Sequence, residues 1–227
     1  MNYRITGTGS CIPDITKKNS DFLQNKFLDR DGIDTQSSNS EIIEKFKSIT
    51  GIYQRRYASD EINSSDLATV AAKGAIVNSK IDQEKLDYII VAHNAGDISY
   101  NSGQVDTLPS IASKVKAKLK IKNPNCVAYD IICGCPGWLE GIIQAKSFIK
   151  SGMANKCLII VCDTLSRILD ENDRDSMIYA DGSGATILEK DTSYDGGILS
   201  HKSATYTHEG ENDFIFYGSS YDKELRE

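Results

Sequence analysis

The sequence predicts an α/β fold, because strand-like and helix-like segments alternate along most of the chain. Short apolar runs are followed by stretches in which apolar residues recur at helical spacing. The run at residues 87–93 is almost continuously apolar, as expected of a central strand that is buried on both faces. A chain of 227 residues that is 40% hydrophobic can also bury a full core.

The expected elements follow this alternation from the N-terminus. Strands are expected at residues 3–11, 52–57, 87–93, 126–130, 156–162, 186–189 and 197–205. Helices are expected at residues 19–28, 41–49 and 108–119. A further helix is expected to follow Ser64 or Ser65 and to include residues 67–76, and another to begin near Pro136 and to end at Gly152. Ser40 is expected to cap the second helix, and Ser64 or Ser65 the third, because a serine hydroxyl accepts from unpaired N–H groups at a helix start.

Composition and charge exclude several classes of protein. A net charge of −6 argues against a nucleic-acid-binding protein, which would carry a basic face. No apolar run approaches the roughly 20 residues that a membrane span needs, and the first residues lack the apolar core of a signal peptide. The six cysteines are scattered and form no disulfide framework. The sequence therefore predicts a soluble protein of the reducing cytoplasm that binds neither nucleic acid nor membrane.

The candidate nucleophile is Cys135, at the junction between an apolar strand and an amphipathic helix that Gly152 ends. We expect it at or near the N-cap, with Pro136 at the first helical position, where a missing N–H costs nothing. Unpaired N–H groups and the positive end of the helix dipole favour a thiolate there, and a thiolate can act as a covalent nucleophile. A second interpretation stays open, in which Cys135 is a small buried hydrophobic residue.

Other candidate sites are weaker. Cys133 is interpreted as structural, and no Cys or His pair at ligand spacing completes a metal site with it and Cys135. The Gly-rich segment 181–184 lacks the ending of a phosphate-binding loop, so we expect a tight structural turn. The alternate lysines from Lys114 to Lys122 could attract an acidic carrier protein, but a solvated segment is the preferred interpretation.

Five motifs resemble those of the β-ketoacyl-acyl-carrier-protein synthase III family, within the thiolase-like superfamily. The segment from Ala128 to Trp138 resembles the active-site segment, in which Cys135 takes the place of the nucleophile. The other four motifs keep the family's order and rough spacing between about residues 3 and 205. They are ITGTGSCIP at 5–13, TGI with QRRY at 50–57, LDYIIVA at 86–92 and DGSGA at 181–185.

The resemblance implies a fold and an activity. It implies the N-terminal half of a thiolase-like enzyme, with a mixed five-stranded sheet and helices on both faces, over residues 1–205. Residues 206–227 would begin a linker to a C-terminal half that this chain lacks. The implied enzyme is an acyltransferase that holds an acyl group on Cys135 and joins it to a malonyl thioester with loss of CO2. Alternatives are a hydroxymethylglutaryl-CoA-synthase-like acyltransferase and a noncatalytic partner subunit.

The resemblance also implies partners. These are acyl carrier protein, an acyl thioester substrate and a second copy of the chain, which could pair through the strand at 126–129; no cofactor and no metal are implied. The family's catalytic His and Asn come from its C-terminal half, so we assign neither His93, His201 nor His208 to catalysis. The chain is expected to be an excised half, with a naturally short protein as the alternative. The isolated chain is therefore predicted to lack condensing activity.

The substrate-binding positions depart from the family pattern. Where the family places an aromatic residue and an arginine for coenzyme A, this chain has Lys45 and Ile49, with Phe46 one residue away. A second arginine of the family corresponds to Arg174. These departures argue against an acyl-CoA primer and leave open a primer bound to acyl carrier protein or an unusual primer. Trp138, where Phe is commoner in the family, is expected to pack into the core.

Overall fold

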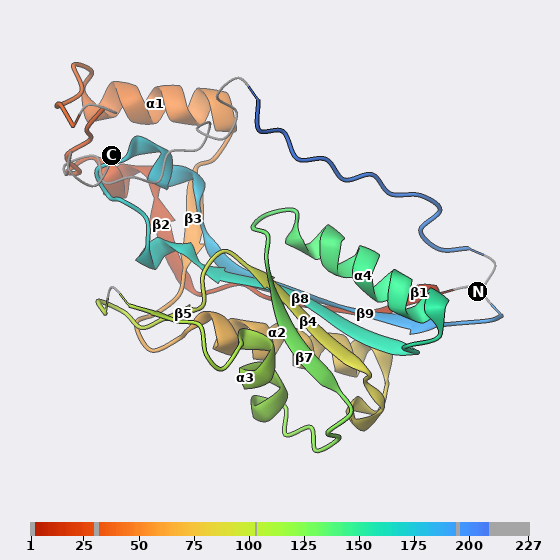
Figure 1. Ribbon diagram of the computed structural model, residues 1–227. Helices are drawn as coiled ribbons and strands as arrows, with labels where there is room; N and C mark the ends of the chain where they lie inside the picture. The colour runs from red at the N-terminus through yellow and green to blue at the C-terminus, as the bar shows by residue number, and fades with distance from the viewer. Residues whose placement is uncertain (1–2, 30–31, 103, 194–195, 209–227) are drawn as a thin grey trace.

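The computed structural model describes residues 3–29, 32–102, 104–193 and 196–208. One five-stranded sheet forms its centre, in the order β1-β9-β8-β4-β7 (Figure 1). The strands are β1 (Tyr3–Cys11), β4 (Tyr88–His93), β7 (Val127–Ile132), β8 (Lys156–Thr164) and β9 (Asp181–Lys190). β4 pairs in parallel with β7 and β8, whereas β9 pairs antiparallel with β8 and β1. The predicted mixed five-stranded sheet is confirmed.

Helices cover both faces of this sheet, as predicted (Figure 1). On one face, α2 (Ser64–Ser79) and α3 (Ile111–Lys118) share a buried core with β4, β8 and β9. On the other face, α4 (Gly137–Ser151) packs its buried side chains against a second set from β4, β8 and β9. Burying an apolar helix stripe against each face removes both from water, which is the main source of stability.

A smaller lobe lies at one end of the sheet (Figure 1). It contains α1 (Asn39–Thr50) and a two-stranded sheet of β2 (Ile15–Lys18) and β3 (Gln54–Tyr57). The lobe has its own core, made of Phe22, Phe27, Ile42, Ile43, Phe46 and Met177. Arg55 of β3 is buried in this lobe, with its guanidinium group over the rings of Phe22 and Phe46.

The remaining elements are short. β5 (Asp97–Ile98) and β6 (Val105–Asp106) form a further two-stranded sheet. Four 3-10 helices are present in the described ranges, namely η1 (Asn19–Phe22), η2 (Gln83–Lys85), η3 (Leu165–Arg167) and η4 (Arg174–Ile178). None of the helices in those ranges combines the length and the apolar character that a membrane crossing needs.

The close approach of α2 to β1 explains the glycines of the first strand. A Cβ atom added at Gly9 would lie 2.2 Å from the carbonyl oxygen of Ala71, and one at Gly7 would lie 2.3 Å from that of Ala75. Backbone atoms of α2 therefore rest directly on the strand, which only residues without a side chain permit. The fully buried alanines of α2 allow the same approach from the helix side.

Several predicted helix starts were wrong by a few residues. Ser38, not Ser40, caps α1, because Ser38 and Glu41 each accept a hydrogen bond from the backbone N–H of the other. Asn63 is the N-cap of α2, so Ser64 and Ser65 lie in its first turn. Ser110 caps α3, whose first residue is Ile111, so Pro109 lies outside the helix.

Three other predicted elements differ in kind. The helix expected at residues 19–28 is only the single 3-10 turn η1, because the backbone and side chain of Asn19 donate to carbonyls at residues 53 and 52. The turn expected at 181–184 is the start of β9, where Gly184 pairs with Ser10 across the sheet. Residues 197–205 form no strand. They are tied instead through Ile198, whose carbonyl accepts from the hydroxyl of Tyr3.

Candidate functional site

Cys135 lies in the turn that connects β7 to α4. β7 ends at Ile132, and α4 begins at Gly137 with Pro136 as its N-cap, so Cys135 is one residue before the predicted position. The turn closes through a hydrogen bond of 3.0 Å from the backbone N–H of Gly137 to the carbonyl of Gly134. Gly134 has φ +57°, a conformation that favours glycine. The side chain of Cys135 is exposed, which excludes the alternative of a buried hydrophobic residue.

The start of α4 lies unusually close to the sheet. A Cβ atom at Gly137 would lie 2.5 Å from the Cβ of Ala92 in β4, and one at Gly141 would lie 2.7 Å from a methyl carbon of Ile159 in β8. Trp138 is 37% exposed, and its Nε1–H donates to the hydroxyl of Thr186 at 3.0 Å. The expectation that Trp138 packs into the core was therefore wrong. The first turns of α4, directly after Cys135, thus pack closely against β4 and β8.

The other cysteines are less suited to nucleophilic chemistry. Cys126, Cys157 and Cys162 are buried, and Cys11 and Cys133 are half-buried. Burial raises the pKa of Cys157 to about 12 and raises the pKa of Cys126 and Cys162 as well. Because the thiolate is the reactive form, these three thiols are protected. Cys135 is the exposed member of the six.

The carboxyl ends of the three parallel strands β7, β4 and β8 meet at the edge of the sheet that carries Cys135. This is the edge where parallel α/β sheets place ligand-binding residues. Asn94, immediately after β4, donates from its backbone N–H and from Nδ2 to the carboxylate of Asp163 near the end of β8. Neither residue was identified from the sequence. Each comes at the end of an apolar run, and that position could have indicated both.

His93 has a structural role in the described part of the chain. It is 3% exposed, and its Nε2 lies 3.0 Å from Oδ2 of Asp130. The same carboxylate accepts from the backbone N–H groups of Ile111 and Ala112 at the start of α3. His93 and Asp130 therefore join β4, β7 and α3.

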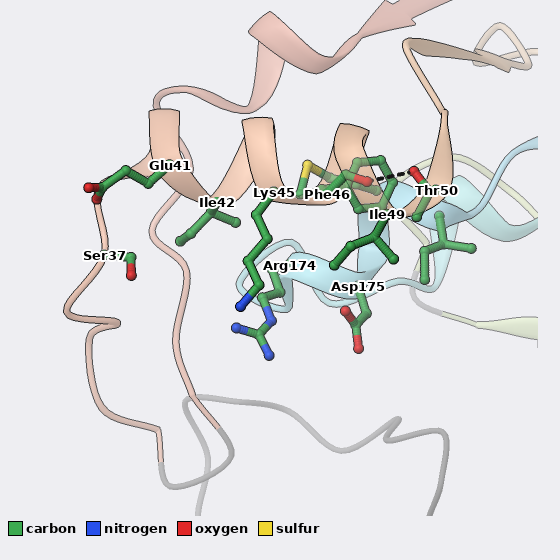
Figure 2. A pocket seen from close by; sticks show the side chains of 11 residues that line it. Ser37, Glu41, Ile42, Lys45, Phe46, Ile49, Thr50, Arg174 and Asp175 are labelled. Carbon is green, nitrogen blue, oxygen red and sulfur yellow. Dashed lines mark hydrogen bonds between the residues drawn. The ribbon is translucent and has the colours of Figure 1, made fainter.

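A cavity of about 300 Å³ lies between α1 and η4 (Figure 2). It brings Lys45 and Ile49 of α1 together with the distant Arg174 of η4, the three residues that the resemblance placed at a coenzyme A site. Lys45 and Arg174 project into the same space from the two elements, and neither forms an ion pair with a carboxylate of the described residues (Figure 2). Two cations over a partly apolar cavity suit an anionic ligand with an apolar portion. Glu41 and Asp175, which also line it, were not identified from the sequence.

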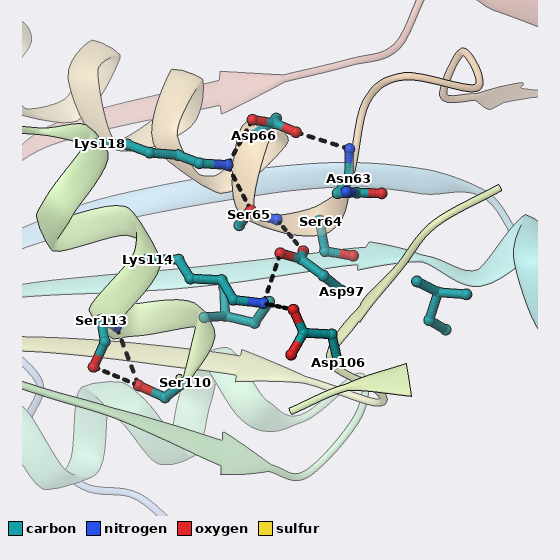
Figure 3. A network of polar contacts seen from close by, with 12 residues as sticks. Asn63, Ser64, Ser65, Asp66, Asp97, Asp106, Ser110, Ser113, Lys114 and Lys118 are labelled. Atoms are coloured by element: carbon teal, nitrogen blue, oxygen red, sulfur yellow. Dashed lines mark hydrogen bonds and ion pairs between the residues drawn. The ribbon is translucent and has the colours of Figure 1, made fainter. Parts of the chain in front are cut away.

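The lysines of α3 are occupied by partners within the chain (Figure 3). Lys114 bridges Asp97 and Asp106 at 3.1 and 2.7 Å, and Lys118 contacts Asp66 at 2.6 Å. Lys116 donates to a backbone carbonyl. Lys114 and Lys118 hold α3 against the β5–β6 sheet and α2, so the interpretation as a merely solvated segment was wrong for the lysines of α3. Lys120 and Lys122, beyond the helix, are exposed. No candidate set of metal ligands occurs among the residues that the structure describes.

This chain is similar to 3-oxoacyl-[acyl-carrier-protein] synthase III. The sequence profile of 3-oxoacyl-[acyl-carrier-protein] synthase III matches residues 129–207, which include the turn of Cys135. The β-ketoacyl-[acyl-carrier-protein] synthase III of Ehrlichia canis is 40% identical over 161 residues, 69% of this chain and 47% of the relative. That of Neisseria gonorrhoeae is 36% identical over 190 residues, 83% of this chain and 52% of the relative. The chain thus spans about half the length of the curated relatives it matches.

Solved structures agree with the sequence relatives. The crystal structure of 3-oxoacyl-[acyl-carrier-protein] synthase III from Aquifex aeolicus matches with a TM-score of 0.69 at 31% identity, over 84% of this chain and 55% of that one. The corresponding enzyme from Thermus thermophilus matches with a TM-score of 0.65 at 30% identity, over 82% and 51%. The predicted thiolase-like fold is therefore confirmed.

Proposed function

We propose that this chain, which is homologous to β-ketoacyl-[acyl-carrier-protein] synthase III over about half of that enzyme's length, carries the acyl-accepting cysteine of a condensing enzyme. The resemblance indicated by the five motifs is confirmed by the matched relatives. The proposed enzyme is an acyltransferase of fatty-acid or polyketide synthesis. The observation that carries the proposal is the exposed thiol of Cys135 in the turn before α4, within the matched residues 129–207.

The proposed chemistry begins with acyl transfer to Cys135. Its thiolate attacks the carbonyl carbon of an acyl thioester, a new C–S bond forms, and the carrier leaves as its thiolate and takes up a proton. One thioester replaces another, so the step is close to neutral in energy. In the complete enzyme the acyl group is then attacked by the carbanion that a malonyl thioester forms when it loses CO2. Hydrogen-bond donors must stabilise the enolate of that second step.

The direct test is acyl transfer to the 227-residue chain from S-acetyl-N-acetylcysteamine, with the acyl group located by proteolysis and mass spectrometry. The proposal predicts that the acetyl group appears on Cys135 and not on Cys133, because only Cys135 is exposed in the turn. A chain that remains unacylated, or that is acylated first at another cysteine, contradicts the proposal.

The cavity between α1 and η4 is proposed to bind the phosphate-bearing part of the thioester carrier. Replacing Arg174 by Ala should raise the half-saturating concentration of acetyl-CoA for acylation about tenfold, because one charge-assisted hydrogen bond is worth roughly 1.5 kcal/mol or more. S-acetyl-N-acetylcysteamine lacks phosphates, so its half-saturating concentration should not change. Acylation kinetics with both donors test this. An equal loss for both donors, or for neither, would refute the assignment of the cavity.

The remaining parts of the proposal concern assembly and location. Acyl carrier protein is the proposed partner that delivers the malonyl group, as the names of the matched relatives suggest. A homodimer is proposed to form through β7, which is an edge strand with exposed side chains at Val127 and Ile132. The cytoplasm is the proposed compartment, since the nucleophilic thiol must stay reduced.

A further inference from the structure

Asn94 occupies the gap between the turn that carries Cys135 and the end of β8. Along the parallel ladders, His93 of β4 is paired with Ile132 of β7, and Ala92 is paired with Val161 of β8. Asn94 is one residue beyond the first pair and two residues beyond the second, so it stands level with Cys133 at the start of the turn on one side and with Asp163 on the other. A side chain at this position can therefore connect the two.

Asp163 fixes the orientation of the Asn94 side chain. Its Oδ1 accepts from the backbone N–H of Asn94 at 2.9 Å, and its Oδ2 accepts from Nδ2 at 2.8 Å. A carboxylate can only accept, so the NH2 group of the amide must face it and Oδ1 of Asn94 must point away. Burial raises the pKa of the Asp163 carboxyl, and the hydrogen bonds from Asn94 offset part of that rise.

The outward-facing Oδ1 of Asn94 rests against the turn. It lies 2.8 Å from the position that a Cβ atom would take on Gly134, the residue between the two cysteines. On the other side of the turn, Gly137 is in contact with Ala92. The backbone that carries Cys135 is thus confined between the side chain of Asn94 and the contact of Gly137 with Ala92. Within this turn Gly134 has φ +57°.

We propose that Asn94, oriented by Asp163, is a positioning residue for Cys135 that holds the cysteine turn in the conformation needed for acyl transfer. The inference rests on the proposed function of Cys135 and adds two residues to its site. Asn94 acts through the backbone of Gly134, not through contact with the acyl group. The effect is geometric, and a misplacement of about 1 Å at a reacting group can cost as much as a hundredfold in rate.

The test compares two reactions of the same thiol in Asn94→Ala. Acylation by S-acetyl-N-acetylcysteamine requires a defined approach to a carbonyl, whereas alkylation by iodoacetamide requires mainly an exposed thiolate. We expect acylation of Cys135 to slow about tenfold and alkylation to stay within about twofold of the unaltered chain. Asp163→Asn should slow acylation in the same direction, because two amides facing each other cannot keep both hydrogen bonds without turning Asn94 over.

Asn123→Ala is the matched control, at the opposite end of β7. Asn123 also donates from its backbone N–H to a carboxylate, that of Glu84, and its Nδ2 donates to a carbonyl. Removing it should cost comparable stability and leave both reactions of Cys135 unchanged. Circular dichroism verifies that each variant is folded, and Asp163→Asn serves if Asn94→Ala does not fold.

The outcomes separate the inference from the proposed function. Acylation at the unaltered rate in both site variants, or acylation and alkylation falling together, overturns the positioning role and leaves the proposed function in place. Failure of the unaltered chain to be acylated at Cys135 removes the proposed function, and the positioning role falls with it. A tenfold loss of acylation alone, absent from Asn123→Ala, supports the inference.

Discussion

Cys135→Ala is expected to abolish acyl transfer to the chain, lowering the rate from a thioester donor by more than about a hundredfold. The reason is that no other cysteine combines exposure with a place at the head of a helix. Three of the other thiols are buried and have a raised pKa, and Cys133 and Cys11 are half-buried. Acyl uptake is measured by intact-mass spectrometry over time.

Cys133→Ala is the matched control for this substitution. Cys133 lies in the same turn, two residues away, and its Cβ faces the start of α4 at Gly137. The variant removes an equal number of atoms but should keep acyl uptake at Cys135. If Cys135→Ala kept acyl uptake, or if only Cys133→Ala lost it, Cys135 would not be the nucleophile.

Arg55→Ala is expected to destabilise the protein by about 3 kcal/mol. The guanidinium group is 5% exposed and donates to the carbonyls of Met177 and Lys17 and to the side chain of Asn19. Removing it leaves two buried acceptors and one half-buried acceptor without this donor, and it opens a cavity between two aromatic rings. For a chain of this size, the melting temperature should fall by about 6 to 12 °C, measured by circular dichroism.

The neighbouring Arg56 supplies the control. Its side chain is only half-buried and reaches two carbonyls at 3.3 Å each, so Arg56→Ala should cost less than about 1 kcal/mol. Arg55→Lys should fall between the two, because a lysine keeps the charge but cannot donate in three directions. Equal losses from Arg55→Ala and Arg56→Ala would mean that the lobe does not depend on the buried guanidinium group.

The fold was predictable where local pattern and tertiary role agree. The almost continuous apolar run at 87–93 forms the interior strand β4, and Gly152 ends α4 as its C-cap with φ +81°. Pro136 and Cys135 were placed correctly to within one residue, because proline and the apolar spacing both mark a helix start. Such positions are specified by the residues themselves.

The failures occurred where distant pairing overrides local composition. Residues 181–184 have the composition of a turn, yet they form a strand because β1 and β8 offer a partner on each side. The 3-10 turn η1 replaces the expected helix because Asn19 is bound to the lobe around residues 52 and 53. No local pattern contains these partners.

The site was predictable in part for the same reason. Cys135 and Arg174 were identified through motifs, and Lys45 and Ile49 through their place before the Thr-Gly-Ile segment. Asn94 and Asp163 belong to no motif, and their relation depends on the parallel register of β4 with β8. Residues 209–227, which include most of the expected linker, lie outside the described residues.

The most direct measurement is the order in which the six cysteines of the native chain react with iodoacetamide at mildly alkaline pH. Peptide mass spectrometry reports the modified fraction of each thiol over time. If Cys135 is an accessible nucleophile before α4, it should be modified well before Cys126, Cys157 and Cys162. Burial raises the pKa of those three thiols. Slow modification of Cys135 together with those three would contradict the account.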